Sequence, residues 1–232
     1  MKKLGLIGGI GPESTVQYYQ QIIKLFRKTL ATTSYPLLTI ESIDMTQMLG
    51  YVNAGRLEEL TDFLLESIDR LVKNGAQLVA MASNTPHIVF DRLIQKTDVP
   101  LVSIVVSTCA EIKRQQISSA GLFGTRSTMN AGFYKEVALR ENIEIYLPNE
   151  EEQSYIHDKY FSELVFNKIV PSTRKALIEI GENLRARHGI EGLILGGTEL
   201  PLILDQSDYQ HLSLFNTTEI HVKQIVEKII EA

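Results

Sequence analysis

Four short motifs in the chain combine glycine with hydroxyl, amide and acidic side chains. The first two are Gly8-Gly9-Ile10-Gly11-Pro12 and Ser83-Asn84-Thr85-Pro86-His87. The other two are Gly124-Thr125-Arg126-Ser127-Thr128 and Gly196-Gly197-Thr198-Glu199. Hydroxyl, amide and backbone N–H groups supply the hydrogen bonds that a carboxylate or an α-amino group requires. The motifs therefore predict a site for a small molecule that carries these groups.

The first motif has three interpretations. Its glycines permit a tight turn and bring backbone N–H groups close to a ligand, and a following helix start favours an anion. A carboxylate-binding loop fits these features. A dinucleotide loop fits less well, because the spacing lacks a third glycine at Ser14 and Pro12 removes one donor. A plain strand-to-helix turn is the third interpretation.

The other motifs also have structural alternatives. Ser83, Asn84 and Thr85 suit a bound α-amino acid, or they form an N-cap cluster. His87 is either a base or a structural histidine. Thr125 and its neighbours suit a second carboxylate. Glu199 is either an acid or base, or a residue that orients Thr198, and the structural role is the favoured one.

Apolar runs that alternate with amphipathic stretches must position these motifs. The alternation predicts parallel sheets covered on both faces by helices. Predicted strands are 4–7, 37–42, 78–82, 101–104, 120–123, 143–146 and 193–195. Predicted helices are 13–30, 57–74, 86–95, 129–141, 153–166, 173–187 and 218–231.

The two halves of the chain resemble one another. Residues 75–91 align without a gap with residues 189–205, and a second match joins the first and third motifs. We therefore predict an internal duplication with two similar, pseudo-twofold related lobes and a ligand cleft between them. The predicted division is 1–100 plus 212–232 for the first lobe and 101–211 for the second.

Composition excludes several classes of protein. The chain has 232 residues and a formal net charge of −5, so it has no electrostatic attraction to nucleic acid or to an anionic membrane. The apolar run 4–10 is too short for a signal peptide or a membrane span. Cys109 is the single cysteine and allows no internal disulfide. We expect a cytoplasmic protein.

Together the four motifs resemble the aspartate branch of the aspartate/glutamate racemase superfamily. That branch is similar in Gly-Gly-Met-Gly-Pro, Cys-Asn-Thr-x-His, Gly-Thr-x-x-Thr-Met…Phe-Tyr and Gly-Cys-Thr-Glu, which correspond here to the four motifs and to Met129, Phe133 and Tyr134. The resemblance implies two Rossmann-like lobes, a homodimer, and neither a cofactor nor a metal. It also implies two opposed bases that act at Cα of an amino acid.

The same resemblance assigns the site residues. The two base positions, which are cysteines in the family, are Ser83 and Gly197 here. Cys109 matches neither motif and is expected to be a buried structural thiol. The implied substrate-binding residues are Ile10, Gly11, Gln47, Asn84, Thr85, Thr125, Thr128 and Thr198, with His87 and Glu199 as accessory groups. Gln47 is uncharged where the family often has a basic residue, which weakens the case for aspartate or glutamate.

Three functions follow as hypotheses. The first is an aspartate/glutamate racemase-like isomerase that transfers a proton at Cα without pyridoxal phosphate, with activity weakened or altered because both thiols are absent. The second is a non-catalytic protein that binds an amino acid or carboxylate. The third, a nucleotide-dependent enzyme, rests on the first motif alone. If the first hypothesis holds, Ser83→Cys with Gly197→Cys is expected to increase racemisation.

Overall fold

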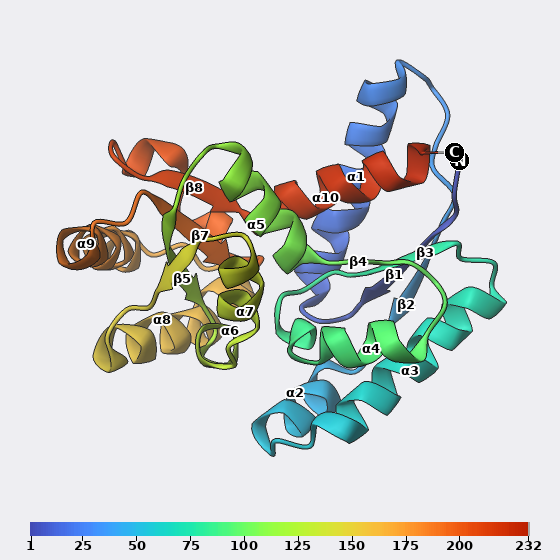
Figure 1. Ribbon diagram of the computed structural model, residues 1–232, viewed down its shortest axis with the longest axis horizontal. Coiled ribbons are helices and arrows are strands. Elements are labelled where there is room, and N and C mark those ends of the chain that lie inside the picture. Colours follow the sequence, from blue (N-terminus) through green and yellow to red (C-terminus); the bar gives the residue numbers. More distant parts are fainter. Residues whose placement is uncertain (232) are drawn as a thin grey trace. The chain divides into compact units, whose positions relative to one another are not determined.

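The computed structural model describes residues 1–231 and contains two compact units. Unit 1 comprises residues 1–104 and 218–231, and unit 2 comprises residues 105–217. Each unit has one four-stranded sheet, with strand orders β2-β1-β3-β4 and β6-β5-β7-β8 (Figure 1). All of the strand pairs are parallel. The two units therefore share one topology, as the α/β prediction of two similar lobes required.

The elements of unit 1 alternate along the chain. Its strands are β1 (Leu4–Gly8), β2 (Leu38–Ser42), β3 (Leu78–Met81) and β4 (Leu101–Val102). Its helices are α1 (Pro12–Leu30), α2 (Met45–Asn53), α3 (Leu57–Lys73), the 3-10 helix η1 (Thr85–Val89), α4 (Phe90–Lys96) and α10 (Thr217–Ile230), whose first residue belongs to unit 2.

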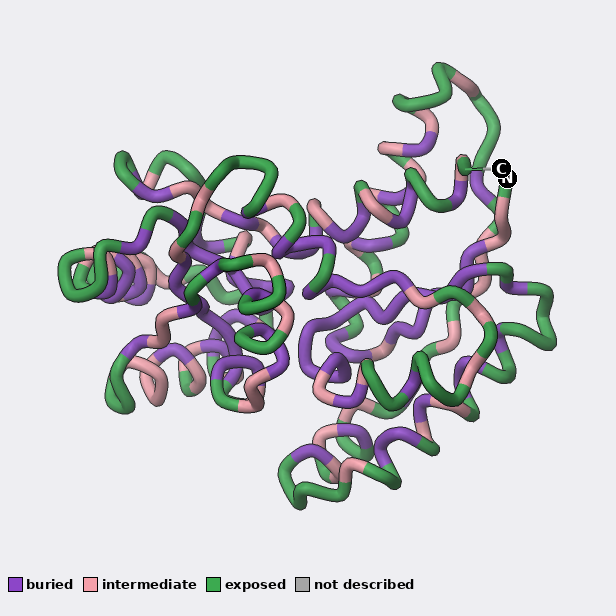
Figure 2. Tube along the Cα trace, in the orientation of Figure 1, coloured by how far each residue is buried: buried purple, intermediate pink, exposed green. Residues whose placement is uncertain are grey.

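Apolar side chains cover both faces of the sheet in unit 1. One core joins Leu4 and Leu6 to α1 and α10, and a second core joins Ile7 and Val79 to α2, α3 and α4. The central strands β1 and β3 are buried along their length, whereas β2 is partly exposed (Figure 2). Near-continuous apolar strands are typical of a parallel sheet with helices on each side. This arrangement leaves the carboxyl edge of the sheet for polar residues.

Unit 2 repeats the alternation. Its strands are β5 (Ser119–Gly124), β6 (Glu144–Tyr146), β7 (Gly192–Gly196) and β8 (Ser213–Asn216). Its helices are α5 (Ile104–Arg114), whose first residue belongs to unit 1, α6 (Arg126–Asn130), α7 (Phe133–Arg140), α8 (Glu150–Ser162), η2 (Leu164–Phe166), α9 (Pro171–His188), η3 (Leu200–Leu202) and η4 (Gln206–Asp208). One core joins Phe123 on β5 and Leu195 on β7 to α8 and α9.

The observed elements differ from the predicted ones in a few places. Strand β8 and helix α2 were not predicted, and no predicted helix range covers α5. The predicted helix over residues 129–141 is two helices, α6 and α7, interrupted at Gly132 with φ +85°. The predicted lobe boundaries lie before residues 101 and 212, whereas the units divide after residues 104 and 217. The difference arises because β4 pairs with β3 and β8 pairs with β7, so each fourth strand stays in its own sheet.

Candidate functional site

The glycine loop after β1 is shaped by its contacts with the β2–α2 connection. A Cβ atom on Gly9 would lie 2.3 Å from the Ile43 carbonyl oxygen, and both Gly9 and Gly11 have positive φ. The Gly9 N–H donates to Thr15 Oγ1 (2.8 Å), and the Gly11 N–H lies 3.3 Å from Met45 Sδ. These residues have to be glycine for conformational reasons, and part of the loop's hydrogen-bonding capacity serves the fold.

The second motif lies at the end of β3, beside the start of α1. The Ser14 hydroxyl donates to the Ala82 carbonyl (2.8 Å), which ties the two segments together. Ser83, Asn84 and Thr85 are all buried. Asn84 stands at the N-cap of η1 without a side-chain capping bond, so an N-cap cluster does not account for this motif. The structure thus gathers three buried polar residues at the carboxyl edge of the sheet in unit 1.

His87 is buried and held as a neutral ring. Its Nε2 accepts a hydrogen bond from the Ile104 backbone N–H (3.2 Å), so Nε2 is the unprotonated nitrogen. The ring stacks on Phe90, with centroids 5.2 Å apart. Burial, together with the neighbouring His221, lowers the pKa of His87 to about 3. Because the basic lone pair is already engaged, these contacts favour a structural role over activation of Ser83.

Ile10, in the glycine loop after β1, and Gln47, on α2, have different surroundings. Ile10 is buried in the unit 1 core, so its side chain serves packing. Gln47 is exposed on α2 and donates to the Tyr51 hydroxyl (3.1 Å). Asp44 caps α2 and accepts from the Thr46 and Gln47 N–H groups. The structure therefore shows Gln47 as an exposed, uncharged side chain.

In unit 2, the third motif forms a buried pair of threonines at the end of β5. Thr125 is the N-cap of α6 and accepts from the Thr128 N–H, and the two hydroxyl oxygens are 3.1 Å apart. A Cβ on Gly196 would lie 3.2 Å from Thr128 Cγ2, which places the pair directly against the end of β7. The third and fourth motifs of the sequence are therefore neighbours at one edge of sheet 2.

The fourth motif carries a buried carboxylate. Glu199 and Thr198 are each 3% exposed, and the Thr198 hydroxyl donates to Glu199 Oε2 (2.7 Å). The Tyr160 hydroxyl on α8 donates to the same oxygen. Within residues 1–231 no cation forms an ion pair with this carboxylate. Two hydroxyls thus hold Glu199 in place, and the bond from Thr198 agrees with the structural role, orienting Thr198, that the sequence favours.

Tyr160 is the functional candidate that sequence reasoning missed. It is buried, and its ring lies against Gly197, which the family resemblance predicts as the second base position. Burial and the Glu199 carboxylate raise the pKa of Tyr160 well above its usual value, so the phenol remains protonated. Its helical spacing with Ile156 and Leu164 indicated only a core residue. No signal in the sequence joins it to a motif that lies 37 residues away.

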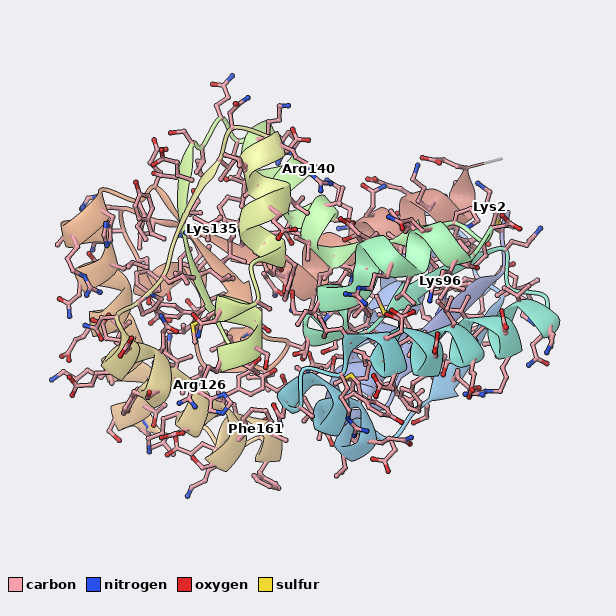
Figure 3. The ribbon with its side chains drawn as sticks, turned by 60° about the horizontal axis from the view of Figure 1, so that its bottom comes forward. Lys2, Lys96, Arg126, Lys135, Arg140 and Phe161 are labelled. Carbon is pink, nitrogen blue, oxygen red and sulfur yellow. The ribbon has the colours of Figure 1, made fainter. Side chains whose placement is uncertain are left out.

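A basic side chain stands at the rim of the same edge. Arg126 begins α6 and is exposed; its backbone N–H donates to His157 Nδ1 (3.1 Å), and its guanidinium reaches Ser154 Oγ (3.3 Å). His157 packs edge-on against Phe161, with centroids 5.0 Å apart. Figure 3 labels Arg126 and Phe161 on this side of unit 2. Burial and Arg126 lower the pKa of His157.

Cys109 and the remaining chemistry lie apart from these motifs. Cys109 is buried on α5, and burial raises the pKa of its thiol to about 12. Across residues 1–231, no group of three or more His, Cys, Asp or Glu side chains has an arrangement that could hold a metal ion. Nor does any helix in that range combine the length and apolar character needed to cross a membrane.

Solved structures and curated sequences resemble this chain. An aspartate racemase homologue from Pyrococcus horikoshii OT3 is 36% identical, with a TM-score of 0.87 and complete coverage of both chains. The Picrophilus torridus aspartate racemase, at 20% identity and a TM-score of 0.75, covers 99% of this chain and 94% of its own, and shows the shared fold. The broad specificity amino-acid racemase RacX of Bacillus subtilis is 25% identical over 58% of this chain and 59% of its own length.

A sequence profile of the same kind of protein covers most of the chain. The Asp/Glu/hydantoin racemase profile matches residues 7–225, which include all four motifs and every strand except the first three residues of β1. Because the profile match extends over far more than half of the sequence, and the fold agrees with solved members, the chain belongs to the Asp/Glu/hydantoin racemase family.

Proposed function

We propose that this protein binds a small α-amino acid or related carboxylic acid and transfers a proton at its Cα without a cofactor. The observation that supports this proposal is the cluster of buried hydroxyl and amide residues at the carboxyl edge of each sheet. Burial of polar side chains in a fold that does not need them for its core is typical of a binding site. Family membership supplies the reaction class.

In this proposal each unit provides polar groups at the carboxyl edge of its own sheet. Thr125, Thr128 and Thr198 would hold a carboxylate, and Asn84 and Thr85 would hold the amino acid's other polar groups. Ser83 in unit 1 and Gly197 at the end of β7 in unit 2 are the two positions where the family pattern has its acid–base residues. Aspartate and glutamate are the first substrates to test, although the exposed Gln47 provides no charge for a side-chain carboxylate.

The expected reaction is slow. A serine hydroxyl is a poor base unless a neighbour activates it, and the lone pair of His87 is engaged with the Ile104 N–H. A positioned acid or base contributes roughly 10²–10⁴-fold to a rate, and neither thiol of the family pattern is present at positions 83 and 197. We therefore expect proton transfer well below that of a two-cysteine racemase.

The test is proton exchange at Cα in D2O. The protein is incubated with each enantiomer of a panel of amino acids, and α-deuterium and enantiomer ratio are followed by NMR and chiral chromatography. We expect deuterium incorporation into at least one amino acid, and its reduction by Ser83→Ala. No incorporation with any member of the panel, by protein that still binds the acid, would refute proton transfer.

A non-catalytic binding protein is the second candidate, and the Tyr160 ring beside Gly197 favours it. A thermal-shift screen against the same panel distinguishes the two functions, because a ligand that binds only the folded state raises the melting temperature. Stabilisation by an amino acid without deuterium incorporation would establish binding alone. Stabilisation together with incorporation would establish the enzyme.

A further inference from the structure

The space beside Gly197 is filled by an aromatic ring. A Cβ atom at this position would lie 2.5 Å from Tyr160 Cε2, 3.1 Å from Cζ and 3.2 Å from the hydroxyl oxygen. Contacts below about 3 Å between carbon atoms are strongly repulsive, so no side chain fits here unless the ring moves. The glycine is therefore required by the neighbour on α8, since its own φ is not positive.

The ring of Tyr160 is fixed from several directions. Tyr160 is 7% exposed and belongs to the core of unit 2. Phe161 packs edge-on against it, with centroids 5.5 Å apart, and its hydroxyl donates to the buried Glu199 carboxylate. Displacing the ring would break this hydrogen bond and leave Glu199 with the Thr198 hydroxyl alone. The contact with position 197 is therefore not relieved by a simple rotation.

Glu199 is unusual for a buried carboxylate. No cation pairs with it in the described chain, and two hydroxyl groups provide its hydrogen bonds. An ionised carboxylate away from water is costly unless it is hydrogen-bonded or paired. A fold that only needed a packed core would have used an apolar side chain at this place. Its burial and its two hydroxyl donors make Glu199 a candidate for chemistry at the carboxyl edge of the unit 2 sheet.

We propose that Tyr160 occupies the volume of the second thiol and, through its hydroxyl, positions Glu199, so that a carboxylate replaces a thiol as the ionisable group at the end of β7. Tyr160 is a positioning residue in this account. The side-chain sizes at positions 160 and 197 are then coupled. A large residue at 160 requires glycine at 197, and a small residue at 160 permits cysteine at 197. The functional meaning of the pair rests on the proposed proton transfer, whereas its steric part does not.

Substitution of cysteine for Gly197 tests the steric part of the proposal, and Gly50→Cys is the matched control. Gly50 is exposed on α2, and a Cβ there would meet no atom within 4 Å. We expect Gly197→Cys to lower the urea midpoint by about 1 M relative to Gly50→Cys. The loss should persist in a Tyr160→Phe background, which keeps the ring, and largely disappear in a Tyr160→Ala background, which removes it.

Thiol labelling gives a second measurement on the same variants. The native Cys109 is buried with a raised pKa, so it should label only on unfolding. Labelling under native conditions should be fast for Gly50→Cys and measurable for Gly197→Cys with Tyr160→Ala. Equal urea midpoints for Gly197→Cys and Gly50→Cys, or no relief by Tyr160→Ala, would overturn the steric proposal.

A double-mutant cycle tests the positioning of Glu199. Tyr160→Phe removes only the hydroxyl, and Glu199→Gln removes only the charge. We expect the two losses in urea midpoint to be non-additive, because both substitutions act on the same charge-assisted hydrogen bond: Tyr160→Phe removes its donor, and Glu199→Gln removes the charge of its acceptor. We also expect Tyr160→Phe to lower the exchange kcat about tenfold with little change in KM. Additive losses would overturn the positioning role.

The outcomes separate this inference from the proposed function. If the wild-type protein exchanges no α-proton but Gly197→Cys is destabilised and relieved by Tyr160→Ala, the function fails and the steric pairing stands. If exchange occurs and Gly197→Cys is tolerated, the function stands and the pairing fails. Exchange that survives iodoacetamide treatment is expected, since no thiol takes part.

Discussion

Position 197 illustrates how one neighbour changes the meaning of a residue. From the sequence, Gly197 is a missing base. In the structure it is also the space that Tyr160 requires, because its Cβ would lie 2.5 Å from that ring. Restoring the thiols is therefore a three-residue change, and the expectation that two cysteines suffice has to be revised.

We predict that Ser83→Cys with Gly197→Cys is less stable than wild type and gains no racemisation. Adding Tyr160→Ala should relieve the contact and raise the rate of enantiomer interconversion by about tenfold or more over the parent, because two thiols then act as acid and base. Chiral chromatography of aspartate and glutamate reactions measures the gain. A double variant as active as the triple one would contradict the role given to Tyr160.

Two buried histidines in unit 1 make stability depend on pH. His221 Nδ1 lies 2.9 Å from the Tyr18 hydroxyl and Nε2 lies 3.0 Å from the Val102 carbonyl oxygen, which fixes a neutral ring. Burial lowers the pKa of His221 to about 4, and burial with His221 lowers that of His87 to about 3. Their ordinary value is 6.5. The unfolded chain therefore binds protons that the folded chain does not.

We predict that acid destabilises the protein through these rings. As pH falls below about 6.5, the free energy of unfolding decreases by about 1.4 kcal/mol per pH unit for each histidine, until the folded pKa is reached. Urea unfolding at about pH 7 and about pH 5 measures the slope. His221→Gln should reduce the slope, and the exposed His211→Gln should leave it unchanged. Equal slopes in all three proteins would contradict the assignment.

At the scale of elements, α8 connects helix capping to the site. Asn149 caps α8 in a capping box: its side chain accepts from the Glu152 N–H (2.9 Å), and Glu152 accepts from the Asn149 N–H (2.9 Å). The same helix carries Tyr160 and His157, which border the edge of sheet 2. The position of the site residues therefore depends on where α8 begins.

We predict that Asn149→Ala lowers the free energy of unfolding by about 1 kcal/mol, because the cap of α8 is lost. Asn149→Asp is the matched control, since aspartate accepts the same hydrogen bond and suits a helix N-terminus. Urea unfolding provides the measurement. A loss of the same size in both variants would show that the cap does not set the stability of this helix.

The elements that the sequence predicted were those with a strong local pattern. The helices over 57–74 and 173–187 were within two residues of α3 and α9, because apolar residues recur at the helical period and glycine or asparagine ends each helix. The missed β8 is only four residues long and has a half-buried, mixed pattern, so no local periodicity marks it. Strands of this kind are defined by the neighbour they pair with.

At the scale of the whole molecule, the two units have separate cores, and the buried histidines lie only in unit 1. The three histidines of unit 2 include His157, half-exposed, and the exposed His188 and His211. Acid should therefore weaken unit 1 more than unit 2. If the two units unfold in one cooperative transition, both lose the same amount of stability in acid.

We predict that amides of β1 and β3 lose more protection than amides of β5 and β7 when pH falls from about 7 to about 5. Hydrogen exchange with mass spectrometry measures this, after correction for the intrinsic exchange rate at each pH. His221→Gln is the control: it should make the loss of amide protection in the unit 1 sheet more similar to the loss in the unit 2 sheet. Equal losses in both units would show a single cooperative transition.

The sequence by itself determined the alternating α/β architecture, the two similar lobes and the four motifs at strand ends, because each depends on local periodicity or on a short string of residues. Only the tertiary structure decided what surrounds those motifs. In the folded chain the Ile104 N–H donates a hydrogen bond to the unprotonated ring nitrogen of His87, and Tyr160 lies against Gly197 and Glu199. Such contacts join residues far apart in the chain, and the physical reason is that packing, unlike periodicity, is fixed only when the whole core is assembled.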